Sequence, residues 1–137
     1  MKDISKYSRG QAGENSAAVF LLNSGFDIIG RNYRSPVGEI DIIAVQKNGD
    51  QSDNNREAEK NDILVFIEVK AWSTFSMENL QYGINKKKCK KIVETAKYFL
   101  QKHRKYIESS IRFDVVFIDT TKITHIKSAF TENICQE

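Results

Sequence analysis

Charged residues interrupt two short apolar segments of this chain. Glu39 and Asp41 fall within residues 38–45, and Glu68 and Lys70 fall at the end of residues 63–70. Both segments have the length and the Ile, Val and Phe content of core strands. An unpaired charge is costly to bury in such a strand. These four residues are therefore the first candidates for a functional site.

Strand periodicity brings these charges together. Residues two apart share a strand face, so we expect Glu39 to lie with Asp41, and Glu68 with Lys70. If the strands are neighbours, Asp41 and Glu68 lie close enough to repel each other. Mg²⁺ (or Mn²⁺) would relieve that repulsion, because such a cation takes one or two carboxylates and completes its shell with water and phosphate. The pattern predicts a divalent-metal site.

Lys70 gives this site a chemical role. Metal-bound water with a lowered pKa can attack phosphorus. Lys70 could orient or deprotonate that water, or neutralise charge on the phosphate. The alternative is a purely structural ion-pair network of Lys70 with Glu68 or Asp41, although such networks stabilise proteins weakly. The residues alone leave both interpretations open.

Glu14 is a further candidate from a predicted helix over residues 12–24. It stands three and four positions before Ala17 and Ala18, so it shares their inward face. One interpretation places this carboxylate near the charged strands. The other is that Glu14 only complements the positive end of the helix dipole.

Lysines crowd the start of a second predicted helix, over residues 85–103. They are Lys86, Lys87, Lys88, Lys90 and Lys91. Cations at a helix N-terminus oppose the dipole, so helix stability alone would not select them. A solvated face and a phosphate-contacting surface both remain possible explanations.

Composition places the chain among ordinary globular proteins. Its 137 residues suit one domain, are 40% apolar and 28% charged, and carry a net charge of +3 with a pI near 8.8. This mildly basic balance permits a nucleic-acid partner without requiring one. Apolar runs of membrane-spanning length and a secretory leader are both lacking, so we expect a cytoplasmic protein with no membrane partner. Cys89 and Cys135 match neither a zinc site nor a disulfide framework.

The predicted elements alternate in a definite order. The first half is expected to hold a polar start over residues 1–11, a helix over 12–24, a strand over 26–34, a turn over 35–38, a strand over 39–45 and a solvated loop over 47–62. The second half is expected to hold a strand over 63–70, a helix over 85–103, a strand over 111–118 and a short edge strand over 123–126. The buried stripe of the second helix would run from Cys89 to His103. This order predicts an α/β domain, spanning residues 1–137, with a mixed central sheet flanked by helices.

Asp41 followed by Glu68-Val69-Lys70 resembles the Asp…Glu-x-Lys signature of the restriction-endonuclease-like nucleases, the PD-(D/E)xK superfamily. Further segments resemble, in the same order, the YraN family of uncharacterised bacterial proteins, which is related to archaeal Holliday-junction resolvases. They are Gly13-Glu14, residues 31–34, 38–44, 65–70 and 112–116, and His125-Ile126 before Ala129-Phe130. Together these segments cover nearly the whole chain.

The resemblance implies a restriction-endonuclease-like core of order α-β-β-β-α-β. It also implies metal ligation by Asp41 and Glu68, catalysis involving Lys70, and Glu14 as a supporting acid at the same metal. Glu39 matches the family motif; it would either assist the metal or bind a basic neighbour.

Two features depart from the family pattern. Trp72 stands where an arginine is usual, and it could stack on a base or simply pack. The loop over residues 47–62 is longer than is common in the family. Neither departure removes an expected metal ligand.

The resulting hypothesis is Mg²⁺-dependent hydrolysis of DNA phosphodiester bonds, at branched or structured sites. Arg31 or Arg34, the lysines from Lys86 to Lys91, and Trp72 are the expected nucleic-acid contacts. The alternative is a non-catalytic nucleic-acid-binding or accessory protein that retains the nuclease fold; a protein-interaction scaffold is a third. Related resolvases act as dimers, so the resemblance also allows a homodimer.

Overall fold

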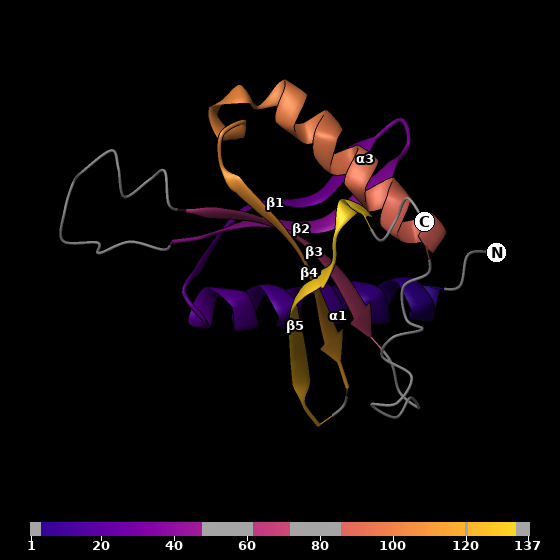
Figure 1. The fold of residues 1–137 in the computed structure, drawn as a ribbon. Helices are drawn as coiled ribbons and strands as arrows, with labels where there is room; N and C mark the ends of the chain where they lie inside the picture. Colours follow the sequence, from indigo (N-terminus) through magenta and orange to yellow (C-terminus); the bar gives the residue numbers. More distant parts are fainter. Residues whose placement is uncertain (1–3, 48–61, 72–85, 120, 134–137) are drawn as a thin grey trace.

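The computed structural model describes residues 4–47, 62–71, 86–119 and 121–133, which form one sheet with a helix on each face (Figure 1). The elements are α1 (Ile4–Asn23), β1 (Phe26–Ser35), β2 (Gly38–Gln46), β3 (Ile63–Ala71), α3 (Lys86–Lys102), the 3₁₀ helix η2 (Arg104–Tyr106), β4 (Ser110–Ile118) and β5 (Ile123–Phe130). The strand order is β1-β2-β3-β4-β5. The predicted mixed α/β fold is confirmed, with a fifth strand at the edge.

β3 is the central strand and is buried on both faces. Leu64 and Phe66 pack in the cluster that contains α3, whereas Val65 and Ile67 pack in the cluster that contains α1. β3 pairs antiparallel with β2 and parallel with β4. Because helices cover both faces, an uninterrupted apolar run is what this strand needs. Glu68, which is also buried, is therefore an exception that packing does not explain.

The two helices lie on opposite faces of the sheet (Figure 1). Each presents a stripe of apolar residues to the face that it covers. From α1 these are Ala17, Ala18 and Leu21, and from α3 they are Cys89, Ile92, Val93, Ala96 and Phe99. Both sets follow helical spacing, as the sequence predicted. Within the described ranges, neither helix has the length and apolar character needed to cross a membrane.

The β1–β2 hairpin is tied to α3. Ser35 Oγ accepts hydrogen bonds from the N–H groups of Val37 and Gly38, both at 3.2 Å. It also lies 3.1 Å from Oγ1 of Thr95, which is fully buried. A Cβ atom at Gly38 would stand only 3.2 Å from that same oxygen. The predicted turn is confirmed, and its contact with Thr95 holds β2 against the helix.

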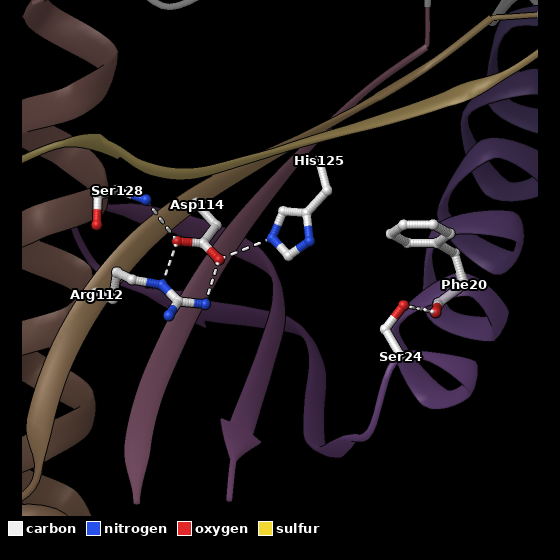
Figure 2. A network of polar contacts seen from close by, with 6 residues as sticks. All are labelled: Phe20, Ser24, Arg112, Asp114, His125 and Ser128. Atoms are coloured by element: carbon white, nitrogen blue, oxygen red, sulfur yellow. Dashed lines mark hydrogen bonds and ion pairs between the residues drawn. The ribbon is translucent and has the colours of Figure 1, made fainter. Parts of the chain in front are cut away.

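A buried carboxylate joins β4 to the edge strand β5 (Figure 2). Asp114 is 0% exposed; it accepts bonds from Arg112 Nε (2.8 Å), Arg112 Nη2 (2.9 Å) and the N–H of Ser128 (3.0 Å). His125 Nε2 lies 2.8 Å from its second oxygen, and the His125 ring packs edge-on against Phe20 of α1. Burial alone would raise the pKa of Asp114, but the bonds from His125 and Arg112 outweigh it and lower the pKa.

Helix α1 differs from its predicted extent. It begins at Ile4 rather than near Ala12, so the expectation of a non-helical polar start is wrong from residue 4 onwards. The preceding residues lack apolar periodicity, but most of them cost little in a helical backbone, so the helix extends beyond its packed stripe. Its predicted end is confirmed: Gly25 adopts φ 92°, a conformation suited to glycine after a helix.

Two predictions in the C-terminal half of the chain, on the extent of β5 and on His103, are also corrected. β5 runs from Ile123 to Phe130 instead of ending at 126. Its pairing with β4 shifts register between Phe113 and Val115, and the Asp114–Ser128 hydrogen bond spans this irregularity. His103 is exposed instead of completing the buried stripe, because α3 ends at Lys102.

Some predictions fall outside the described residues. Trp72 does so, as does the predicted solvated loop apart from Lys47 and Asp62. The extent of the single domain over residues 1–137 stays a prediction.

Candidate functional site

Asp41 and Glu68 meet where β2 and β3 stop pairing. The paired register ends at Ile42 and Ile67, and the next position along each strand is Asp41 and Glu68. There the backbone N–H of Val69 donates to Oδ2 of Asp41 at 2.8 Å. The side chain of Asp41 is thus anchored to the backbone of β3, directly beside Glu68.

β2 changes its side-chain alternation at this point. Ile40 packs in the α3 cluster, whereas Ile42 packs in the α1 cluster, although regular alternation would place both on one face. On the neighbouring strand, Asn32 adopts φ 52°, between the residues that pair with Ile40 and Ile42. A local irregularity of β1 and β2 therefore sets the direction of Asp41.

This irregularity separates Glu39 from Asp41. Glu39 is exposed and forms an ion pair with Arg34, with 3.4 Å between Oε2 and Nε. The prediction that Glu39 and Asp41 share one face is therefore wrong, because alternation is interrupted between them. Of the two roles open to Glu39, the contact with a basic neighbour is the one observed.

Four charged groups interact at the site. Burial, and then the negative charge of Glu68, raise the pKa of Asp41 to about 7. Glu68 is 6% exposed and forms an ion pair with Lys88. Burial, and then the positive charge of Lys88, lower the pKa of the Lys70 ammonium. Burial would likewise lower the pKa of Lys88, but the hydrogen bond and charge of Glu68 raise it.

Lys88 is the member of this group that sequence reasoning placed elsewhere. It was expected only as one of several lysines near phosphate, yet it lies against Glu68. Helical spacing contains the missing signal: Lys88 precedes Ile92 by four residues and Thr95 by seven, and both are buried. Lys88 is therefore on the side of α3 that turns toward the sheet.

Glu14 is buried, as predicted, but has partners of its own. Its Oε1 accepts hydrogen bonds from Arg31 Nε at 3.2 Å and from Asn32 Nδ2 at 3.0 Å. Among the residues that the structure describes, no three His, Cys, Asp or Glu side chains are grouped so that they could hold a metal ion. The structure thus brings Asp41 and Glu68 together, whereas the contacts of Glu14 are with Arg31 and Asn32 of β1.

The other expected nucleic-acid contacts occupy different surroundings. Lys86, Lys87, Lys90 and Lys91 are exposed on the first turns of α3. The side chain of Arg34 is 81% exposed, whereas that of Arg31 is 36% exposed and is engaged by Glu14. Arg31 therefore joins α1 to β1 through Glu14, whereas the other cations remain exposed to solvent.

The donor set suits a hard divalent cation. Asp41 and Glu68 supply carboxylate oxygens side by side; burial, and then the negative charge of Glu68, raise the pKa of Asp41, and a cation would remove the repulsion between the two. The ion-pair alternative has a structural basis too, because Lys88 already compensates the charge of Glu68. The partner expected in that alternative was Lys70, so the observed pairing differs from the predicted one.

Comparison with known proteins assigns the family. The model for uncharacterised protein family UPF0102 matches residues 13–118. A UPF0102 protein of Treponema denticola is 38% identical over 130 residues, covering 90% of this chain and 95% of that protein. One of Persephonella marina is 37% identical over 122 residues (89% and 92%), and one of Ehrlichia ruminantium is 39% identical over 132 residues (96% and 90%). The chain therefore belongs to the UPF0102 family.

Proposed function

We propose that this protein is a metal-dependent nuclease that hydrolyses phosphodiester bonds in DNA, related to the YraN proteins and the PD-(D/E)xK nucleases. The observation that carries the proposal is the contact of Asp41 with Glu68, beside Lys70. A buried carboxylate beside a partly buried one, at the end of two strands, is costly for folding, and perturbed groups of this kind concentrate at functional sites.

Asp41 and Glu68 would hold Mg²⁺ or Mn²⁺, which when bound supplies an activated water and compensates phosphate charge. The hydrogen bond from Val69 to Asp41 fixes one ligand before any cation arrives. Glu14 would act indirectly, because its bonds to Arg31 and Asn32 fix the strand beside Asp41.

Lys70 would act on the substrate or on water. The lowered pKa of its ammonium brings it nearer to the range in which it can exchange a proton with an attacking water. In its charged form it would instead stabilise negative charge on phosphate. Lys88 enters the site from α3 and adds a second ammonium close to the same carboxylates.

Exposed lysines at the start of α3 supply the nucleic-acid contacts in this proposal. Lys87, Lys90 and Lys91 stand on the helix that also carries Lys88, so a phosphate backbone crossing them would be led to the acidic pair. Branched or otherwise structured DNA is the proposed substrate, and a homodimer the proposed assembly; both rest on the family resemblance.

One observation favours a second candidate, a non-catalytic nucleic-acid-binding protein. The Lys88–Glu68 ion pair compensates one of the two carboxylates without any metal. If this arrangement persists in the presence of Mg²⁺, the site is a structural network, and the exposed lysines serve binding alone.

The deciding experiment offers linear, nicked, flapped and four-way-junction DNA to the protein, with and without Mg²⁺ or Mn²⁺. We expect metal-dependent cutting that disappears in Asp41→Asn and Lys70→Met and persists in Lys127→Met, a matched change at an exposed position of β5. Binding without cutting of any substrate would favour the second candidate. Cutting that survives both site variants would contradict the assignment of the site.

A further inference from the structure

A second group of basic and aromatic residues lies at the far end of α3 from the acidic pair. This distal surface consists of Tyr98, Lys102, His103, Arg104, Lys105 and Tyr106. Glu94 is the only acid between Lys86 and Lys105, so the positive charge runs along the whole helix and into η2. None of the expected nucleic-acid contacts includes these residues.

The lysines of the distal surface are positioned by neighbouring rings. Lys102 Nζ lies over the ring of Tyr98, 5.5 Å from its centroid, and Lys105 Nζ lies over the ring of Tyr106 at 5.3 Å. Such cation–π contacts restrict a flexible side chain while leaving the ammonium able to meet an anion. Within the described part of the chain, Lys102, Arg104 and Lys105 form no ion pair with an acid, in contrast to Lys88 and Lys97.

The imidazole of His103 belongs to the same surface. It is exposed, yet its ring stacks on Phe99 with centroids 4.3 Å apart and planes at 27°. Tyr33 of β1 packs against both rings, at 6.3 Å from His103 and 5.2 Å from Phe99. The surface therefore rests on the hydrophobic core, so its polar groups are held in place at the exposed end.

Helix stability accounts for only part of this charge. Lys102 is in the last turn of α3, where a cation complements the negative end of the dipole. That effect fades within one turn, and Arg104 and Lys105 lie beyond the helix, in η2. A ligand that carries regularly spaced negative charge is a better explanation for the whole set.

We propose that the distal surface is a second contact for the phosphate backbone of duplex DNA, an inference that rests on the proposed function. Lys88 and Lys102 are fourteen positions apart on one helix, or about 21 Å at a rise of about 1.5 Å per residue. At about 3.4 Å per base step, this distance spans roughly 6 base pairs. The substrate is thus a duplex arm extending at least that far from the acidic pair.

The test compares Lys102→Gln/Lys105→Gln with the matched control Lys122→Gln/Lys127→Gln, which removes the same charge from exposed positions before and within β5. Binding to a duplex of about 20 base pairs is measured by fluorescence anisotropy in EDTA over a range of salt concentrations. The slope of log K against log[salt] is negative, and loss of two phosphate contacts should reduce its magnitude by about 1.8, at about 0.9 per contact. At about 0.1 M salt the same loss weakens binding at least tenfold. The control should keep the wild-type slope.

Duplex length provides a second measurement. Wild-type affinity should be higher for a duplex of about 12 base pairs than for a hairpin stem of about 4, which is too short to reach from Lys88 to Lys102, and the double variant should lack most of that difference. Equal slopes in both double variants, or a slope change seen with duplex RNA and absent with duplex DNA, would overturn the proposal. Binding is measured without metal, so a protein that binds DNA but does not cut it would contradict the proposed nuclease activity and not the distal surface. A protein that cuts DNA but shows unchanged slopes would contradict only the distal surface.

Discussion

Lys88, in the first turn of α3, forms an ion pair with Glu68 on β3 and so compensates a carboxylate that is almost fully buried. This contact links the helix to the strand end that carries the proposed chemistry. It also places an ammonium where a divalent cation would compete for the same oxygen. The first prediction uses that competition.

Lys88→Met should destabilise the protein by about 1–3 kcal/mol, because Glu68 is left buried without its partner and Lys88 itself is partly exposed. Mg²⁺ at millimolar concentration should restore more stability to this variant than it adds to the wild type, since the cation replaces the missing charge. Urea unfolding with and without Mg²⁺ measures both effects. Lys87→Met, on the exposed side of the same turn, is the control. An equal Mg²⁺ effect in all three proteins would refute metal binding at Glu68.

Asp41→Asn should change how stability depends on pH in the metal-free protein. The pKa of Asp41 is about 7 in the folded protein and about 3.9 in the unfolded chain. Between these two pH values the folded state binds more protons than the unfolded chain. The contribution of Asp41 to the free energy of unfolding is therefore greatest below about pH 4 and decreases as the pH rises to about 7. The fall amounts to a few kcal/mol at about 1.4 kcal/mol per unit of pKa.

The Asn variant lacks this titration, so its advantage over the wild type should grow from pH 5 to pH 8. Denaturant unfolding at several pH values, without divalent ions, tests it. Parallel stability curves for the two proteins would show that Asp41 ionises normally.

Asp114→Ala should destabilise the protein by about 3–5 kcal/mol, because it leaves Arg112 without its buried counter-charge and unpairs the N–H of Ser128. The pKa of Asp114 is lowered, whereas that of Asp41 is raised, so the two groups affect stability in opposite pH ranges. The stabilisation by Asp114 is fully present above the unfolded pKa of about 3.9 and is lost as pH falls through the folded value.

The wild type should therefore lose stability below about pH 4 more steeply than Asp114→Ala. Asp27→Ala is the control, because Asp27 forms an exposed pair with Lys47 and should contribute at most about 1 kcal/mol. Thermal unfolding from pH 2 to pH 7 measures both variants. Similar losses in the two variants would show that the network in Figure 2 does not stabilise the β4–β5 edge.

Glu14→Gln tests whether Glu14 binds the metal directly or only positions β1. Glu14 contacts Arg31 and Asn32, not the acidic pair. We therefore expect the Mg²⁺-induced increase in stability to survive in Glu14→Gln and to disappear in Asp41→Asn. Calorimetric titration with Mn²⁺ offers an independent measurement. A loss of metal affinity in Glu14→Gln as large as that in Asp41→Asn would make Glu14 a direct ligand.

The amino-acid sequence by itself determined the periodic features of this protein. Alternation and apolar content located the strands, helical spacing located the buried stripe of α3, and Gly25 marked the end of α1. Helical spacing also placed Glu14 inward, where it is 8% exposed. These features depend on residues close together in the chain, and local periodicity reports them directly.

Only the tertiary structure decided which charges meet. The break in alternation at Asp41 depends on how β1 and β2 pair, and it directs Asp41 to Glu68 while Glu39 turns to Arg34. Helical spacing places Lys88 on the inner side of α3, but its contact with Glu68 depends on how α3 lies across the sheet. The long edge strand likewise depends on Asp114 bonding to Ser128, fourteen residues away. Register and helix placement are set by packing across the whole domain, and that packing selected the members of the site.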